Sequence, residues 1–156
     1  MQAAPTPDDF WLLDTLVRVK VGHASGPDSM SLLEHLARHG DSPPLHVHTT
    51  EDELFYILEG KVRLRLGETE RMAGPGESLL APKGVPHAYR VESREGGRFL
   101  TVTVGGDFEK FVRAMGRPAT RLELPPPGGP PSPEAQAALV ATARQFGIEI
   151  VGPPLH

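Results

Sequence analysis

The stretch GDSPPLHVHTTEDELFYILEG, residues 40–60, is the most informative segment of the chain. Within it His46 and His48 are two positions apart, so on a strand both imidazoles point to the same side. Glu53 follows a short turn and opens a run of strand-forming residues. A second segment, GESLLAPKGVPHAYRV at residues 76–91, places His87 directly after a Pro-Gly loop. Three imidazoles and one carboxylate suit a divalent first-row metal ion, and on an octahedral ion they leave two positions for water, dioxygen or a chelating substrate.

Alternating hydrophobicity on both sides of these segments predicts an all-β fold. Residues 61–66 place Val62, Leu64 and Leu66 on one face, and a tight turn at residues 59–60 joins them to a strand at 53–58, with which they are expected to pair antiparallel. Further strands are expected at residues 10–21, 77–81, 87–91 and 98–104. Residues 31–39 fit a helix as well as a strand. Short strands separated by Gly/Pro turns are typical of a β-barrel or sandwich.

The pattern changes after residue 106. A short helix is expected at residues 107–115, followed by a Pro/Gly-rich linker at 117–131. Ser132 and Pro133 then begin a second helix that runs to Phe146. We therefore expect a barrel domain over residues 1–116 and a C-terminal helix and tail, residues 132–156, packed on it. This helix could instead act as a lid, and the sequence does not decide between the two.

Two spacings resemble the signature motifs of the cupin superfamily. The first is Gly40, five residues, His46-x-His48, four residues, Glu53, six residues, Gly60. The second is Gly76, five residues, Pro82-x-Gly84, two residues, His87. The resemblance implies a jelly-roll β-barrel with His46, His48, Glu53 and His87 as ligands of one divalent metal ion, which could be Fe, Mn, Co, Ni, Cu or Zn. One departure is Val91, which stands where the second motif usually ends in Asn.

The C-terminal part is similar to small quercetin-dioxygenase-like cupins, which also combine a Pro-rich linker with an Ala-rich helix. That resemblance implies a metal-dependent oxidoreductase that cleaves flavonols, or other aromatic hydroxy-ketones, with dioxygen. Glu53 would then be both ligand and general base. It also implies a homodimer formed through residues 10–21. Two other functions stay open: an oxygen-independent isomerase or hydrolase that uses the metal as a Lewis acid, and a non-catalytic binder of metal or small molecules.

Strand alternation also predicts the lining of a substrate pocket. The side chains in phase with Glu53 and His87, with the apolar face of the next strand, are Phe55, Ile57, Val62, Leu64, Tyr89 and Val91. The alternative is that they are ordinary barrel core. The set contains no Lys or Arg, since Arg63, Arg65 and Arg90 fall on the opposite face. The expected substrate is therefore apolar or aromatic and binds the metal through oxygen atoms.

Composition excludes several other classes of function. The net charge of -4 and the pI near 6.0 argue against a nucleic-acid partner. No apolar run is long enough to cross a bilayer, and without cysteine there is no thiolate ligand. A cytoplasmic location is expected. The other histidines are expected to be surface or hydrogen-bonded polar residues: His23, His35, His39 and His156.

Overall fold

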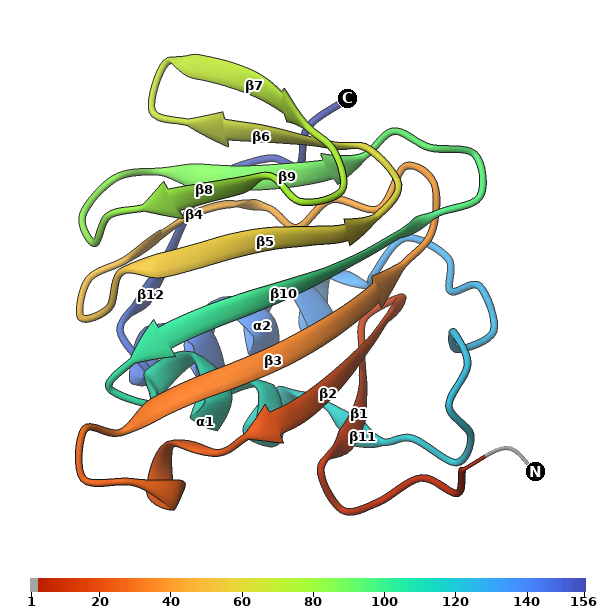
Figure 1. Ribbon diagram of the computed structural model, residues 1–156, viewed down its shortest axis with the longest axis vertical. Coiled ribbons are helices and arrows are strands. Elements are labelled where there is room, and N and C mark those ends of the chain that lie inside the picture. The colour runs from red at the N-terminus through yellow and green to blue at the C-terminus, as the bar shows by residue number, and fades with distance from the viewer. Residues whose placement is uncertain (1–2) are drawn as a thin grey trace.

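The structure, a computed structural model that describes residues 3–156, is a sandwich of two antiparallel sheets (Figure 1). The seven-stranded sheet has the order β11 (Arg117–Pro118), β1 (Asp9–Leu12), β2 (Thr15–Val21), β3 (Met30–Ala37), β10 (Gly97–Val104), β5 (Glu53–Glu59) and β8 (Ser78–Ala81). The five-stranded sheet has the order β12 (Ile148–Gly152), β4 (Leu45–His48), β9 (His87–Val91), β6 (Val62–Leu66) and β7 (Thr69–Ala73). This is the predicted all-β jelly-roll.

The strands expected around the two motifs are confirmed as β5, β6, β8, β9 and β10. The predicted antiparallel pairing of β5 with β6 is wrong, because β5 pairs with β10 and β8 while β6 pairs with β7 and β9. The turn at residues 59–60 therefore leads from one sheet to the other. The ambiguous residues 31–39 are strand β3, in which burial alternates with period two: Ser31, Leu33, His35 and Ala37 are all buried. A helix would have buried one stripe at a period of 3.6 residues instead. The segment is therefore a strand because it pairs with β2 on one side and with β10 on the other.

The sequence predicted one strand over residues 10–21, but the structure has a hairpin there, formed by β1 and β2. Leu13 has φ 53, in the left-handed region, and the chain reverses there. The free side of β1 pairs with β11, where Phe10 faces Pro118 and Trp11 faces Arg117. Within the described chain this pairing covers the sheet edge that suggested a dimer contact. The homodimer stays a prediction.

Two strands of the five-stranded sheet, β7 and β12, were not predicted. In β7, polar and exposed side chains hide the alternation. In β12, Ile148 and Ile150 alternate with Glu149, but the run is short and pairs with β4 far back in the chain. The helices α1 (Asp107–Met115) and α2 (Pro133–Gln145) are as expected, and Ser132 caps α2 by accepting a hydrogen bond from Ala135 N at 3.2 Å.

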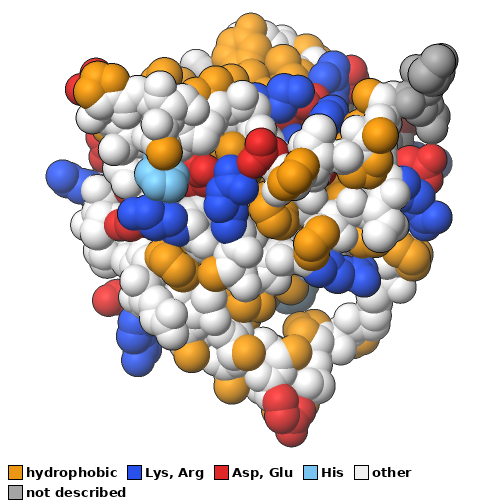
Figure 2. Space-filling view, turned by 90° about the horizontal axis from the view of Figure 1, so that it is seen from below, with side chains coloured by type: hydrophobic (Ala, Val, Ile, Leu, Met, Phe, Trp, Pro, Cys, Tyr) orange, Lys and Arg blue, Asp and Glu red, His pale blue; other side chains and the backbone are white. Residues whose placement is uncertain are grey.

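The buried side chains form two main clusters. The first lies between the sheets and is built around Ile57, Val62, Leu64 and Phe99. In the second, α1 and α2 pack against β1, β2 and β12, so the helices lie behind the lower strands in Figure 1. On the face shown in Figure 2, basic and acidic side chains are interspersed. No described helix is long and apolar enough to span a membrane.

Candidate metal centre

The four predicted ligands come together between the two sheets. His46 and His48 extend from β4, and His87 is the first residue of β9, where it pairs directly with His46. Glu53 is the first residue of β5 and approaches from the other sheet. One ligand atom from each of the four residues lies within 4.8 Å of all the others. The four donor atoms are therefore close enough together to bind one ion.

Backbone carbonyls hold two of the imidazoles in place. His46 Nδ1 lies 2.7 Å from the Pro44 carbonyl oxygen, and His87 Nδ1 lies 3.0 Å from that of Val85. If Nδ1 carries the proton and donates it there, the Nε2 lone pair of each ring is available to the cluster. His87 Nε2 is 3.0 Å from Glu53 Oε2, and His48 Nε2 is 3.5 Å from the same oxygen.

The imidazole of His48 tests whether a metal ion fits. Both of its ring nitrogens are buried and have no hydrogen-bond partner among the described residues. Such an unpartnered buried polar atom costs roughly 1–3 kcal/mol. An ion bound by Nε2 would remove that cost at one nitrogen, and the donor set of three imidazoles and one carboxylate is one that divalent first-row ions accept. The residues therefore fit a metal ion.

The electrostatics of the cluster separate its charged and neutral members. Burial raises the pKa of the Glu53 carboxyl, but the facing imidazoles of His48 and His87 outweigh burial and hold it at about 2. Burial and the neighbouring His87 lower the pKa of His46 to about 3. Glu53 is therefore ionised and His46 neutral at neutral pH, which are the forms that bind a metal.

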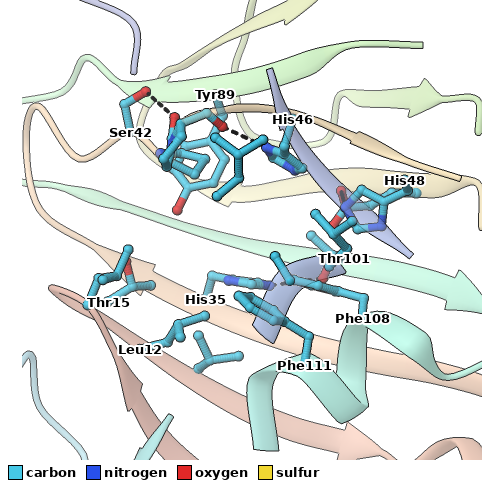
Figure 3. Close-up of a pocket in the computed structure, with 18 of the residues that line it drawn as sticks. Leu12, Thr15, His35, Ser42, His46, His48, Tyr89, Thr101, Phe108 and Phe111 are labelled. Carbon is cyan, nitrogen blue, oxygen red and sulfur yellow. Dashed lines mark hydrogen bonds and ion pairs between the residues drawn. The ribbon is translucent and has the colours of Figure 1, made fainter. Parts of the chain in front are cut away.

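A cavity extends from the cluster toward the helices (Figure 3). Its apolar wall comes from both ends of the chain and includes Leu12, Val17, Phe108, Phe111, Leu139, Ala143, Ile148 and Ile150. Its polar side chains include Thr15, His35, Asp41, Ser42 and Thr101. No Lys or Arg is among the lining residues.

The predicted pocket residues divide into two groups. Phe55 and Tyr89 line the cavity. The other four do not line it and lie in the buried cluster between the sheets: Ile57, Val62, Leu64 and Val91. Their side chains point inward as expected, but they sit farther along their strands and pack against Phe99. These four residues are therefore part of the ordinary barrel core, which was the alternative to a role in the pocket lining.

His35 is a cavity residue that sequence reasoning placed only as a surface or hydrogen-bonded side chain. It is 4% exposed, its Nε2 lies 2.9 Å from Thr101 Oγ1, and its ring stacks on Phe99 at 4.8 Å between centroids. The signal that could have revealed it is the strand register, in which Val17, His35 and Phe99 face one another across three strands. That register is not visible in a single sequence.

Comparison with known proteins agrees with this geometry. Residues 32–103 match the family model for the cupin domain. These residues form a cupin domain. The stretch of the chain that aligns with quercetin 2,3-dioxygenase of Bacillus subtilis (strain 168) is 33% identical over 87 residues, which are 56% of this chain and 26% of that protein. The chain thus spans about a quarter of the length of that relative.

Among solved structures, this chain is similar to a predicted oxalate decarboxylase from Thermotoga maritima and to KdgF from Halomonas sp.. The first shares 19% identity at a TM-score of 0.55, over 58% of this chain and 79% of that one. The second shares 17% identity at a TM-score of 0.54, over 62% and 84%. At these identities the likeness concerns the fold alone. The apolar wall of the cavity lies largely outside the matched residues 32–103.

Proposed function

We propose that this protein is a metal-dependent dioxygenase that acts on a flavonol or another aromatic hydroxy-ketone. The carrying observation is that three members of the His46, His48, Glu53 and His87 cluster, namely His46, His48 and Glu53, line a largely apolar cavity without Lys or Arg. The 33% identity to a quercetin 2,3-dioxygenase over 87 residues supports the choice of reaction. Beyond the metal ion, an anionic group of the substrate would find the carboxylate of Asp41 and no Lys or Arg on this lining.

Within the proposal, each part of the site has a separate task. A metal ion held by the four residues would polarise the oxygens of the substrate as a Lewis acid and, if redox-active, would allow reaction with dioxygen. The aromatic side chains Phe55 and Phe108 would contact the body of the substrate and exclude water. Glu53 Oε2 would accept the proton of the substrate hydroxyl, because its carboxylate is ionised and faces the cluster.

The test measures loss of the quercetin absorbance band together with oxygen uptake, on protein loaded separately with each divalent metal. We expect metal-dependent turnover that falls at least about a hundredfold in Glu53→Gln, the scale of a lost general base. Glu59→Gln, at the exposed end of the same strand, is the matched control and should retain activity. Turnover without oxygen would indicate the Lewis-acid enzyme. Tight binding without any product would indicate a non-catalytic binder.

A further inference from the structure

The cavity has a second polar end at Asp41, away from the metal ligands. Asp41 Oδ2 accepts hydrogen bonds from Thr15 Oγ1 at 2.8 Å and from the Tyr89 hydroxyl at 3.1 Å. Its other oxygen, Oδ1, receives no hydrogen bond from residues 3–156, and no Lys or Arg in that range forms an ion pair with it. Asp41 is half-buried and lines the cavity.

The register of β9 separates the two polar ends. His87 and Tyr89 lie on the same face of that strand, two residues apart, which corresponds to about 7 Å along it. The Phe55 ring lies beside both residues, with its centroid 6.1 Å from that of His87 and 6.4 Å from that of Tyr89. The aromatic side chain of Phe55 therefore connects the four candidate metal ligands to the Tyr89–Asp41 pair. In Figure 3, the Tyr89 ring and Thr15 lie on the opposite side of the labelled group from His48.

The geometry points to Asp41 as a specificity-determining residue that accepts a hydrogen bond from a hydroxyl at the far end of the ligand. The ligand class is a neutral aromatic molecule with two polar ends, a metal-chelating hydroxy-ketone at one and a phenolic hydroxyl at the other. This inference rests on the proposed function for the chelating end. The assignment of the hydroxyl at the far end rests on Asp41 alone. When this carboxylate is ionised, its unpartnered oxygen, Oδ1, can accept a hydrogen bond but cannot donate one.

Two other features of the subsite agree with this assignment. Thr15 and Tyr89 fix the carboxylate through Oδ2, so that Oδ1 is presented in one orientation. At this end of the cavity, the Asp41 carboxylate on a lining without Lys or Arg disfavours a carboxylate or phosphate. A phenolic hydroxyl is a neutral group that can donate to this oxygen.

The test compares quercetin with unsubstituted flavonol, which has the hydroxy-ketone and no other hydroxyl. Both are titrated by calorimetry, without oxygen, into protein loaded with zinc, which is redox-inert and leaves the ligand intact. The wild-type protein is expected to bind quercetin about 10- to 100-fold more tightly, the range of a hydrogen bond to a charged group. Asp41→Ala should bring the two dissociation constants to about the same value.

Two control variants separate recognition from folding. Thr15→Val removes one donor to Asp41 but keeps the carboxylate, so it should lower the melting temperature while retaining a preference for quercetin. Asp28→Ala removes an exposed acidic side chain and should change neither. An unchanged preference in Asp41→Ala, equal binding of the two compounds by the wild type, or binding of neither would overturn the inference. Oxygen uptake is not read in this experiment, so an Asp41-dependent preference can hold even if no metal supports turnover.

Discussion

His48 shows most directly what the metal cluster requires, because both of its ring nitrogens are buried and unpartnered in the described chain. His48→Ala should therefore abolish stoichiometric metal binding, measured by elemental analysis after gel filtration, and His87→Ala should do the same. The exposed His156 gives the matched control, since His156→Ala leaves all four candidate ligands in place. Full occupancy in the first two variants would contradict the site assignment.

His35 predicts a pH dependence of stability in the metal-free protein. Burial lowers the pKa of its imidazole to about 4, below the 6.5 of an exposed histidine. The unfolded chain takes up a proton below pH 6.5 and the folded chain does not until about pH 4, so acidification across this window favours unfolding. The expected loss is about 2 kcal/mol at pH 5 relative to neutral pH.

Urea denaturation of the wild type and of His35→Gln at both pH values measures this contribution. Glutamine keeps a polar group near Thr101 but does not titrate, so the variant should lose about 2 kcal/mol less between neutral pH and pH 5. Other buried histidines contribute equally to both proteins and cancel in the difference. Identical pH dependence in the two proteins would show that His35 is not kept neutral by the fold.

At the scale of elements, α1 begins without a side-chain cap of its own. Its N-cap is Gly106, and the buried carboxylate of Glu51 accepts hydrogen bonds from Asp107 N at 2.7 Å and Phe108 N at 2.9 Å instead. Glu51→Ala should cost roughly 1–3 kcal/mol of unfolding free energy, because two backbone donors lose a charged acceptor. Urea titration measures it, with the exposed Glu68→Ala as control. A loss below about 0.5 kcal/mol, the ordinary range of surface changes, would contradict the cap.

Helix α2 contributes Ala143 to the cavity wall, where the side chain is fully buried. Ala143→Leu should fill part of the cavity and weaken binding of quercetin about tenfold or more while metal stoichiometry stays unchanged, at a stability cost of about 1–3 kcal/mol. Ala141→Leu, on the exposed side of the same helix, is the matched control. Calorimetry on the zinc-loaded proteins measures both. Equal affinity in the two variants would place the ligand elsewhere.

The sequence predicted best what depends on local spacing. The four candidate ligands could be identified because two short motifs carry them. The strands β5 and β6 could be found from their alternation, but their predicted pairing was wrong, because the turn at residues 59–60 carries the chain from one sheet to the other. The turn at Leu13 and the strand β12 were missed, since a left-handed leucine and a pairing across about a hundred residues leave no local signal. Most of the cavity wall was missed for the same reason.

At the scale of the whole molecule, the candidate ligands join the two sheets. Glu53 belongs to the seven-stranded sheet and the three histidines to the five-stranded sheet or its edge. A bound ion would therefore stabilise the packing of one sheet on the other as well as its own site. Free metal at a thousand times its dissociation constant should add about 4 kcal/mol to the free energy of unfolding.

Differential scanning calorimetry with and without a chelator measures that stabilisation. The melting temperature of the wild type should fall when the metal is removed, and that of His87→Ala should be the same in both conditions. A chelator-dependent shift of equal size in His87→Ala would mean that the ion binds at another place in the molecule.

The pairing of β12 with β4 also orders events during synthesis. The strand with His46 and His48 gains its second neighbour, after β9, only when residues 148–152 have been made, about a hundred residues later. At ~5–20 residues per second, the ribosome needs roughly 5–20 s for that interval. All four candidate ligands thus leave the ribosome before the helices and strand that wall the cavity. We expect that an ion can reach the nascent site from solvent during this interval, before the wall closes over it.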